Sequence, residues 1–83
     1  MKQIDNKEKF KQAFMDALSI DESVLKGNLE YNSIEEWDSI GHMSLIAELE
    51  DKFDIMMEMD DIIDINSYEK CAEILKKNYN IEF

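Results

Sequence analysis

The chain has 83 residues and a formal net charge of −11, from 20 Asp and Glu against nine Lys and no Arg. This length accommodates a single domain, residues 1–83, and a hydrophobic fraction of 45% excludes a disordered acidic tail. The surplus of carboxylates disfavours binding to nucleic-acid phosphates or to anionic membranes, and it favours a basic protein as partner.

Several absences narrow the class of protein further. No apolar run reaches the roughly 18 residues that a membrane-spanning helix needs, and the charged first residues do not resemble a secretory signal. Cys71 is the single cysteine and cannot form an intramolecular disulfide. We therefore expect a cytoplasmic protein without membrane insertion, and a monomer, because surfaces of like charge repel one another.

The first predicted helix covers residues 5–18. Asp5 followed three positions later by Glu8 is typical of a capping box at a helix N-terminus. The apolar residues that follow recur at the spacing of one helix face, which predicts that this face packs on the core. They are Phe10, Ala13, Phe14, Ala17 and Leu18.

Residues 19–37 show no sustained period and predict a long ordered loop, with a short turn at residues 21–25. A loop of this length is unusual in a compact domain, which suggests a functional role. A second helix is predicted at residues 39–53, a short third one at residues 60–65, and a last one from Asn66 or Ser67 onward. The apolar stripe of the last helix consists of Tyr68, Cys71, Ala72, Leu75 and Tyr79. The sequence therefore predicts an all-α fold, a four-helix bundle with three main helices, one short third helix and a long first loop.

The second predicted helix carries two apolar stripes. Its core stripe consists of Leu45, Ile46, Leu49 and Phe53. A second stripe, formed by Ile40, Met43 and Ala47, lies roughly 140° away around the same helix. Because one helix of a small bundle cannot easily bury both, the second stripe and its acidic neighbours predict a surface that docks a partner. The alternative is that Ile40 and Met43 pack beneath the long loop.

Two interpretations apply to Asp38 and Ser39, where the second helix begins. Either residue can cap the helix by accepting a hydrogen bond from a free backbone N–H. A serine at this place also holds its hydroxyl where free N–H groups and the helix dipole favour an anion, such as a phosphate diester on that oxygen. Gly41, without a side chain, is then expected to leave space near the phosphate.

Nearly the whole chain, and residues 35–79 most sharply, resembles carrier proteins of the acyl carrier and peptidyl carrier type. Residues 35–55 read EEWDSIGHMSLIAELEDKFDI, in which Asp38-Ser39-Ile40 is similar to the family's Asp-Ser-Leu motif. The resemblance implies the family's helical bundle and a 4′-phosphopantetheine arm attached to Ser39, with Asp38 contributing to recognition by the transferase. It also implies a non-enzymatic role, in which the arm carries acyl or aminoacyl intermediates as thioesters.

The same resemblance implies where partners bind. The partners are a phosphopantetheinyl transferase and acyl-loading and acyl-transferring enzymes with basic docking surfaces. The form Trp-Asp-Ser-Ile-Gly-His is most similar to stand-alone carriers of specialised pathways. The implied partner-facing residues are Ile40, Met43, Ala47, Glu50, Asp51, Glu58, Asp60 and Asp61.

The residues themselves leave a second function open: an acidic helical adaptor that presents the second apolar stripe, formed by Ile40, Met43 and Ala47, to a basic partner and carries no prosthetic group.

Three further features of the sequence are interpreted as follows. His42 lacks an acid at the spacing of a hydrolase triad, which leaves a pH-sensitive structural role as its alternative. The methionines at positions 56, 57 and 59 either fill the core or contact a long acyl cargo. No metal site is predicted, because the acids near Asp60 lack the glycine and glutamate of a calcium loop.

Overall fold

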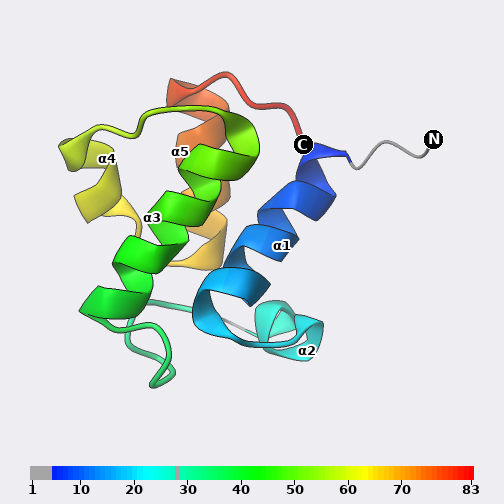
Figure 1. Ribbon diagram of the computed structural model, residues 1–83, viewed down its shortest axis with the longest axis vertical. Helices are drawn as coiled ribbons and strands as arrows, with labels where there is room; N and C mark the ends of the chain where they lie inside the picture. Colours follow the sequence, from blue (N-terminus) through cyan, green and yellow to red (C-terminus); the bar gives the residue numbers. More distant parts are fainter. Residues whose placement is uncertain (1–4, 28) are drawn as a thin grey trace.

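A computed structural model describes residues 5–27 and 29–83 of the chain, and within them it contains helices and no strand (Figure 1). The all-α prediction is confirmed. None of the helices in these ranges is both long and apolar enough to cross a membrane. The helices are α1 (Asn6–Leu18), α2 (Glu22–Lys26), α3 (Ser39–Phe53), α4 (Met59–Asp64) and α5 (Tyr68–Asn78).

The prediction of four helices is wrong, because the long first loop contains the short helix α2. Asp21 caps this helix, with its Oδ1 atom accepting hydrogen bonds from the Ser23 hydroxyl at 2.5 Å and from Val24 N at 3.4 Å. Leu25 is buried, so α2 is held by packing against the rest of the domain. A helix of five residues is too short to show a period, which is why the pattern did not reveal it.

Local capping explains where the predicted helices begin and end. Asp5 Oδ1 accepts a hydrogen bond from Glu8 N at 2.9 Å, and Ser67 Oγ accepts one from Lys70 N at 3.0 Å. Ser19 and Asp54 end α1 and α3 in the left-handed conformation, with φ values of 55° and 54°. These are side-chain and backbone devices that operate within a few residues, so sequence reasoning located the main helices closely.

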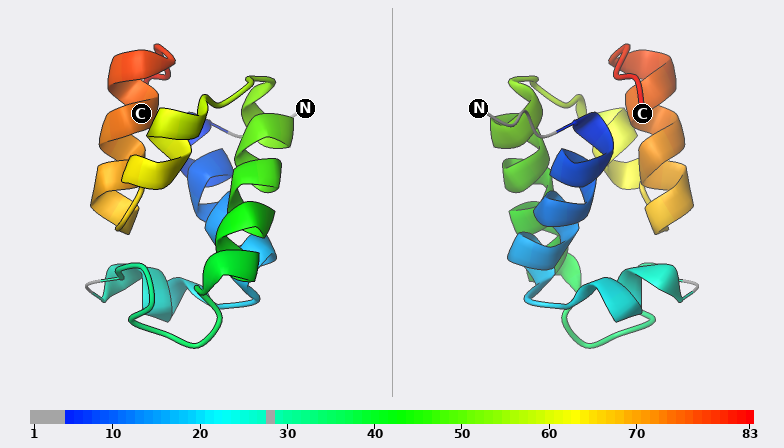
Figure 2. Two further views of the ribbon diagram at one scale, coloured as in Figure 1. Left: turned by 90° about the vertical axis from the view of Figure 1, so that its left-hand side faces the viewer. Right: turned by 90° about the vertical axis from the view of Figure 1, so that its right-hand side faces the viewer.

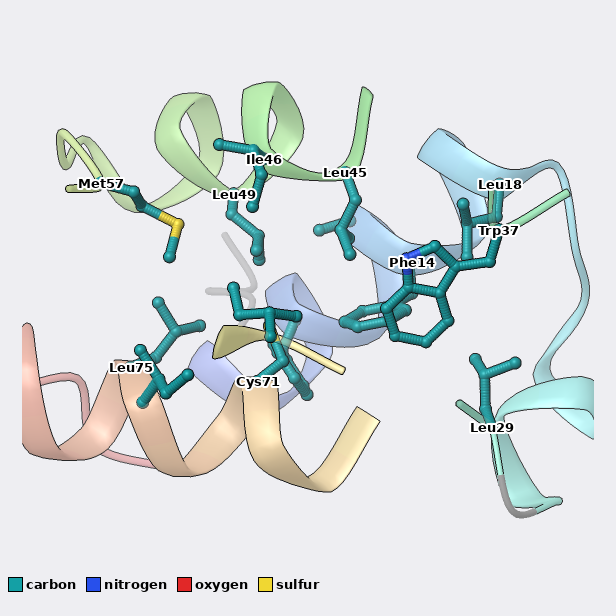
Figure 3. Packing of buried hydrophobic residues seen from close by; sticks show 14 of the residues in the cluster. Phe14, Leu18, Leu29, Trp37, Leu45, Ile46, Leu49, Met57, Cys71 and Leu75 are labelled. Atoms are coloured by element: carbon teal, nitrogen blue, oxygen red, sulfur yellow. The ribbon is translucent and has the colours of Figure 1, made fainter. Parts of the chain in front are cut away.

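The long helices enclose the core, with α1 beside α3 and α5 on the opposite side from α3 (Figures 1 and 2). The short helices cover its remaining faces, α2 at one end of the bundle and α4 between α3 and α5. Figure 3 shows Leu45 and Leu49 of α3 directed toward Cys71 and Leu75 of α5. All four of these side chains are fully buried.

Trp37 is the largest fully buried side chain among the described residues, although it belongs to the loop before α3. Its ring meets the ring of Phe14 edge to face, with centroids 5.4 Å apart (Figure 3). An aromatic residue of this size contributes much of the apolar area that a small core buries. The loop before α3 is therefore anchored from within and forms part of the core.

Backbone pairing fixes the other end of this loop. Tyr31 N donates to Asn66 O at 2.9 Å, and Tyr68 N donates to Leu29 O at 3.0 Å, which forms a short antiparallel bridge. The segment before α5 thus holds residues 29–31 in place. Together with the buried Trp37, this pairing fixes the conformation of the loop that leads into α3.

Candidate functional site

Ser39 is the first residue of α3, and its side chain is exposed. Asp38 caps the helix, because its Oδ1 atom accepts a hydrogen bond from Gly41 N at 2.8 Å. Of the two residues that the sequence offered as the cap, the structure therefore uses Asp38. No hydrogen bond joins the Ser39 hydroxyl to another described residue, so capping leaves this oxygen free for chemistry.

The first turn of α3 also has backbone donors near Ser39. Gly41 N is occupied by Asp38, and His42 N donates to Asp38 O at 2.8 Å. The amides of Ser39 and Ile40 show no hydrogen bond to the rest of the described chain. Free N–H groups at a helix N-terminus, together with the positive end of the helix dipole, favour a phosphate. The donor set at Ser39 fits a phosphoester on its oxygen.

Gly41 does not leave open space near Ser39, contrary to the expectation from the sequence. Gly41 is buried, and a Cβ atom built at this position would overlap the backbone oxygen of Glu36. The same atom would lie 3.1 Å from Leu18 Cδ2. Glycine is therefore needed because the loop before α3 passes directly against the helix.

An apolar groove of about 430 Å³ lies beside Ser39, between the first turns of α3 and helix α4. Met43 of α3 and Met59 and Ile63 of α4 are exposed along it, and Ile62 and Ile65 lie deeper. The groove thus connects Met43, from the second apolar stripe of α3, with apolar residues of α4. The sequence pattern did not indicate that α4 lies next to this stripe. The residues that line the groove are Tyr31, Ser39, His42, Met43, Met59, Ile62, Ile63, Ile65 and Asn66.

The second stripe of α3 is exposed to solvent, as predicted. Ile40 is 77% exposed and Met43 58% exposed, while Ala47 is exposed one turn further on. The alternative, in which Ile40 and Met43 pack beneath the long loop, is wrong, because most of the surface of both side chains is exposed. Binding of a partner to this stripe stays a prediction.

The acidic residues expected to meet partners fall into two groups. Glu50 and Asp61 are engaged within the molecule: Glu50 Oε2 accepts from Met57 N at 2.9 Å, and Asp61 Oδ2 accepts from the Tyr79 hydroxyl at 2.6 Å. Asp51, Glu58 and Asp60 are exposed, and no hydrogen bond or ion pair involves their carboxylates in the described residues. The three exposed carboxylates are therefore better candidates than Glu50 and Asp61 for the long-range attraction of a basic partner.

The methionines at positions 56, 57 and 59 have different roles. Met57 is buried and points into the core, whereas Met56 is 87% exposed and Met59 68% exposed (Figure 3). Core filling is therefore correct for Met57 alone. Met59 lines the groove beside Ser39, and Met56 lies outside it.

Cys71 is fully buried, as its place on the apolar stripe of the last helix predicted. Burial raises the pKa of its thiol well above the ordinary value, because the interior disfavours the thiolate. Cys71 is thus a core residue with little nucleophilic character. Within residues 5–27 and 29–83, no cluster of three acidic, histidine or cysteine side chains is arranged to hold a metal ion.

His42 and Trp37 are the residues of this region whose arrangement sequence reasoning missed. Trp37 Nε1 donates to His42 Nδ1 at 2.9 Å, and His42 Nε2 lies 2.8 Å from Ile62 O in α4. The His42 ring is nearly parallel to the Trp37 indole, with 17° between the planes. In the sequence, only the presence of a single tryptophan in the loop hinted at this connection.

Searches for related proteins found no match: no protein-family model, no curated protein and no solved structure is significantly similar to this chain.

Proposed function

We propose that this chain is a carrier protein, which holds acyl or aminoacyl groups as thioesters on a 4′-phosphopantetheine arm attached to Ser39. One observation carries the proposal: Asp38 caps α3, so the hydroxyl of Ser39 stays exposed and uncommitted at a helix N-terminus. The resemblance of residues 35–55 to carrier proteins supplies the chemical identity of the group.

The residues around Ser39 have separate tasks in this proposal. In loading, the Ser39 oxygen would bond to the phosphorus that carries the pantetheine arm while the pyrophosphate link of coenzyme A breaks. Adenosine 3′,5′-bisphosphate would be the leaving group, and the hydroxyl proton would pass to a base of the transferase. The free amides of Ser39 and Ile40 attract the resulting phosphodiester anion. When bound, the arm supplies a terminal thiol that holds the cargo in an activated form. The chain itself catalyses no step.

The surface around Ser39 supports an encounter with basic enzymes. Between residues 29 and 64 the only cation is Lys52, and it is paired with Asp16 at 3.2 Å and Glu48 at 3.1 Å. Exposed carboxylates therefore dominate the field near the attachment site, and they speed association with a partner of opposite charge. The exposed Ile40 and Met43 provide an apolar contact at the centre of that field.

Intact-mass spectrometry after incubation with coenzyme A, Mg²⁺ and a broad-specificity phosphopantetheinyl transferase tests the proposal. We expect the wild-type chain to gain one phosphopantetheinyl group and Ser39→Ala to gain none. Ser44→Ala is the matched control, since Ser44 is an exposed serine of the same helix, and it should be loaded like the wild type. A folded wild-type chain that gains nothing, also with transferases of other specificity, would favour the adaptor function.

Asp38→Asn separates capping from recognition by the transferase. Asparagine caps a helix about as well as aspartate, so the variant should keep its stability. It lacks the carboxylate charge, however, and we expect slower loading than in the wild type. Equal loading rates would show that Asp38 serves the helix alone.

A further inference from the structure

The two hydrogen bonds of His42 define which ring nitrogen carries its proton. Nδ1 accepts from Trp37 Nε1–H at 2.9 Å and therefore holds no proton of its own. Nε2 consequently carries the proton and donates it to Ile62 O at 2.8 Å. Neutral His42 thus joins the loop before Ser39 to helix α4.

An imidazolium does not fit this arrangement. Protonation would place an N–H on Nδ1, where it would face the N–H of Trp37, and two donors cannot share a hydrogen bond. Within the described residues, His42 Nδ1 is the only acceptor at hydrogen-bond distance from the indole N–H, and Trp37 is fully buried. The bond to Ile62 O survives, because Nε2 keeps its proton in both forms.

The charged groups on the elements packed against His42 are all carboxylates. They attract an imidazolium, but none of them accepts a hydrogen bond from the Trp37 indole, so they do not replace its lost acceptor. The titratable groups of these elements are Glu30, Tyr31, Glu35, Glu36 and Asp38 in the loop and Asp60, Asp61 and Asp64 in α4. Of these, the Tyr31 ring lies against His42, with centroids 5.4 Å apart.

We propose that His42 is a pH-sensitive positioning residue: neutral, it holds the Trp37 indole and with it the backbone that leads into Ser39, and protonated, it releases Trp37 while it stays bound to α4. Trp37 is two residues before Ser39, so the release loosens the backbone at the site itself. A histidine side chain in general changes its charge between about pH 5 and pH 8, the range in which physiological pH values lie. The inference concerns the unmodified chain and is independent of the proposed carrier function.

Nuclear magnetic resonance of the wild-type chain across about pH 8 to pH 5 tests it. We expect the His42 ring nitrogens to show the Nε2–H form at high pH. As the pH falls, the Trp37 indole N–H resonance should move upfield, and its proton should exchange faster with water. The midpoint of this change should coincide with the midpoint of the titration of the His42 ring. An indole resonance that ignores the titration of His42, or a ring that stays neutral until the chain unfolds, would overturn the proposal.

Two variants of His42 separate its hydrogen bond with Trp37 from its hydrogen bond with Ile62 O. Asparagine places its Oδ1 atom near the position of Nδ1, so His42→Asn should keep the acceptor for Trp37 without titrating, and its indole resonance should be constant over the same pH range. His42→Gln places an amide near Nε2 and should keep the bond to Ile62 O instead. A pH profile of the indole that His42→Asn shares with the wild type would contradict the role of His42. If the variants do not fold, the wild-type titration decides alone.

Discussion

The backbone oxygen of Glu36 occupies the place where a side chain at Gly41 would begin. This contact presses the loop before α3 against the first turn of that helix, beside the buried Trp37. It sets the direction in which the chain enters α3, and therefore the orientation of Asp38 and Ser39. A single missing Cβ atom thus contributes to the exposure of the candidate attachment site.

We expect Gly41→Ala to destabilise the protein by about 1–3 kcal/mol, the usual cost of forcing extra volume into a packed region. Alanine gains about 1 kcal/mol over glycine within a helix, but the overlap with a backbone oxygen cannot be relieved by a side-chain rotation. Urea denaturation measures the difference. Gly27→Ala is the control, since its Cβ atom would meet Val24 O at 3.4 Å, and its stability should stay close to that of the wild type. A Gly41→Ala variant as stable as Gly27→Ala would contradict the packing argument.

Asp51→Lys should slow loading by the transferase at low ionic strength, because it reverses a free, exposed charge next to the docking stripe. The difference from the wild type should shrink in about 1 M salt, where charges are screened within a few ångströms. Stopped-flow or discontinuous mass measurements of the loading rate provide the comparison. Glu50 is unsuitable for this test, since Glu50→Lys would also remove the acceptor for Met57 N.

Glu73→Lys makes the same change of charge on α5, which lies on the other side of the bundle from α3 (Figure 2). Its loading rate should stay near that of the wild type. Equal slowing by both variants would indicate that net charge, and not the surface around α3, governs the encounter.

The stability of the protein should fall at alkaline pH, above about pH 10. The pKa of Tyr79 is raised by burial and by its hydrogen bond to Asp61, and burial also raises the pKa of Tyr68. A group that binds its proton more tightly when folded stabilises the fold below its ordinary pKa, and this contribution is lost as pH rises through the folded value.

Tyr79→Phe should flatten this alkaline decline and lower the stability at neutral pH by about 1 kcal/mol, the usual net value of such a hydrogen bond. The Tyr79 hydroxyl accepts from Glu58 N at 2.8 Å and donates to Asp61, so it holds the start of α4. Tyr31→Phe is the control, because no hydrogen bond to a described residue involves that hydroxyl. Thermal or urea unfolding between pH 7 and about pH 11 measures both. An unchanged alkaline slope in Tyr79→Phe would assign the decline to other groups.

Sequence reasoning predicted the parts of this protein that depend on neighbours in the chain. The caps at Asp5 and Ser67 act over three residues, and the apolar periods of α1, α3 and α5 reflect the geometry of one helix. The exposed stripe on α3 followed from the same geometry, since one helix of a small bundle can bury only one of its two apolar faces.

Only the tertiary structure decided which contacts the loop before α3 makes with the helices around Ser39. Trp37 lies in the core, His42 joins it to Ile62, and Glu36 excludes a side chain at Gly41. Nothing in a local pattern encodes these contacts, because they depend on how a loop without a period folds back on two helices. The sequence by itself determined helices α1, α3, α4 and α5 and the candidate serine, but not the short helix α2. Long-range packing decided which nearby groups are free for partners and which hold the fold together.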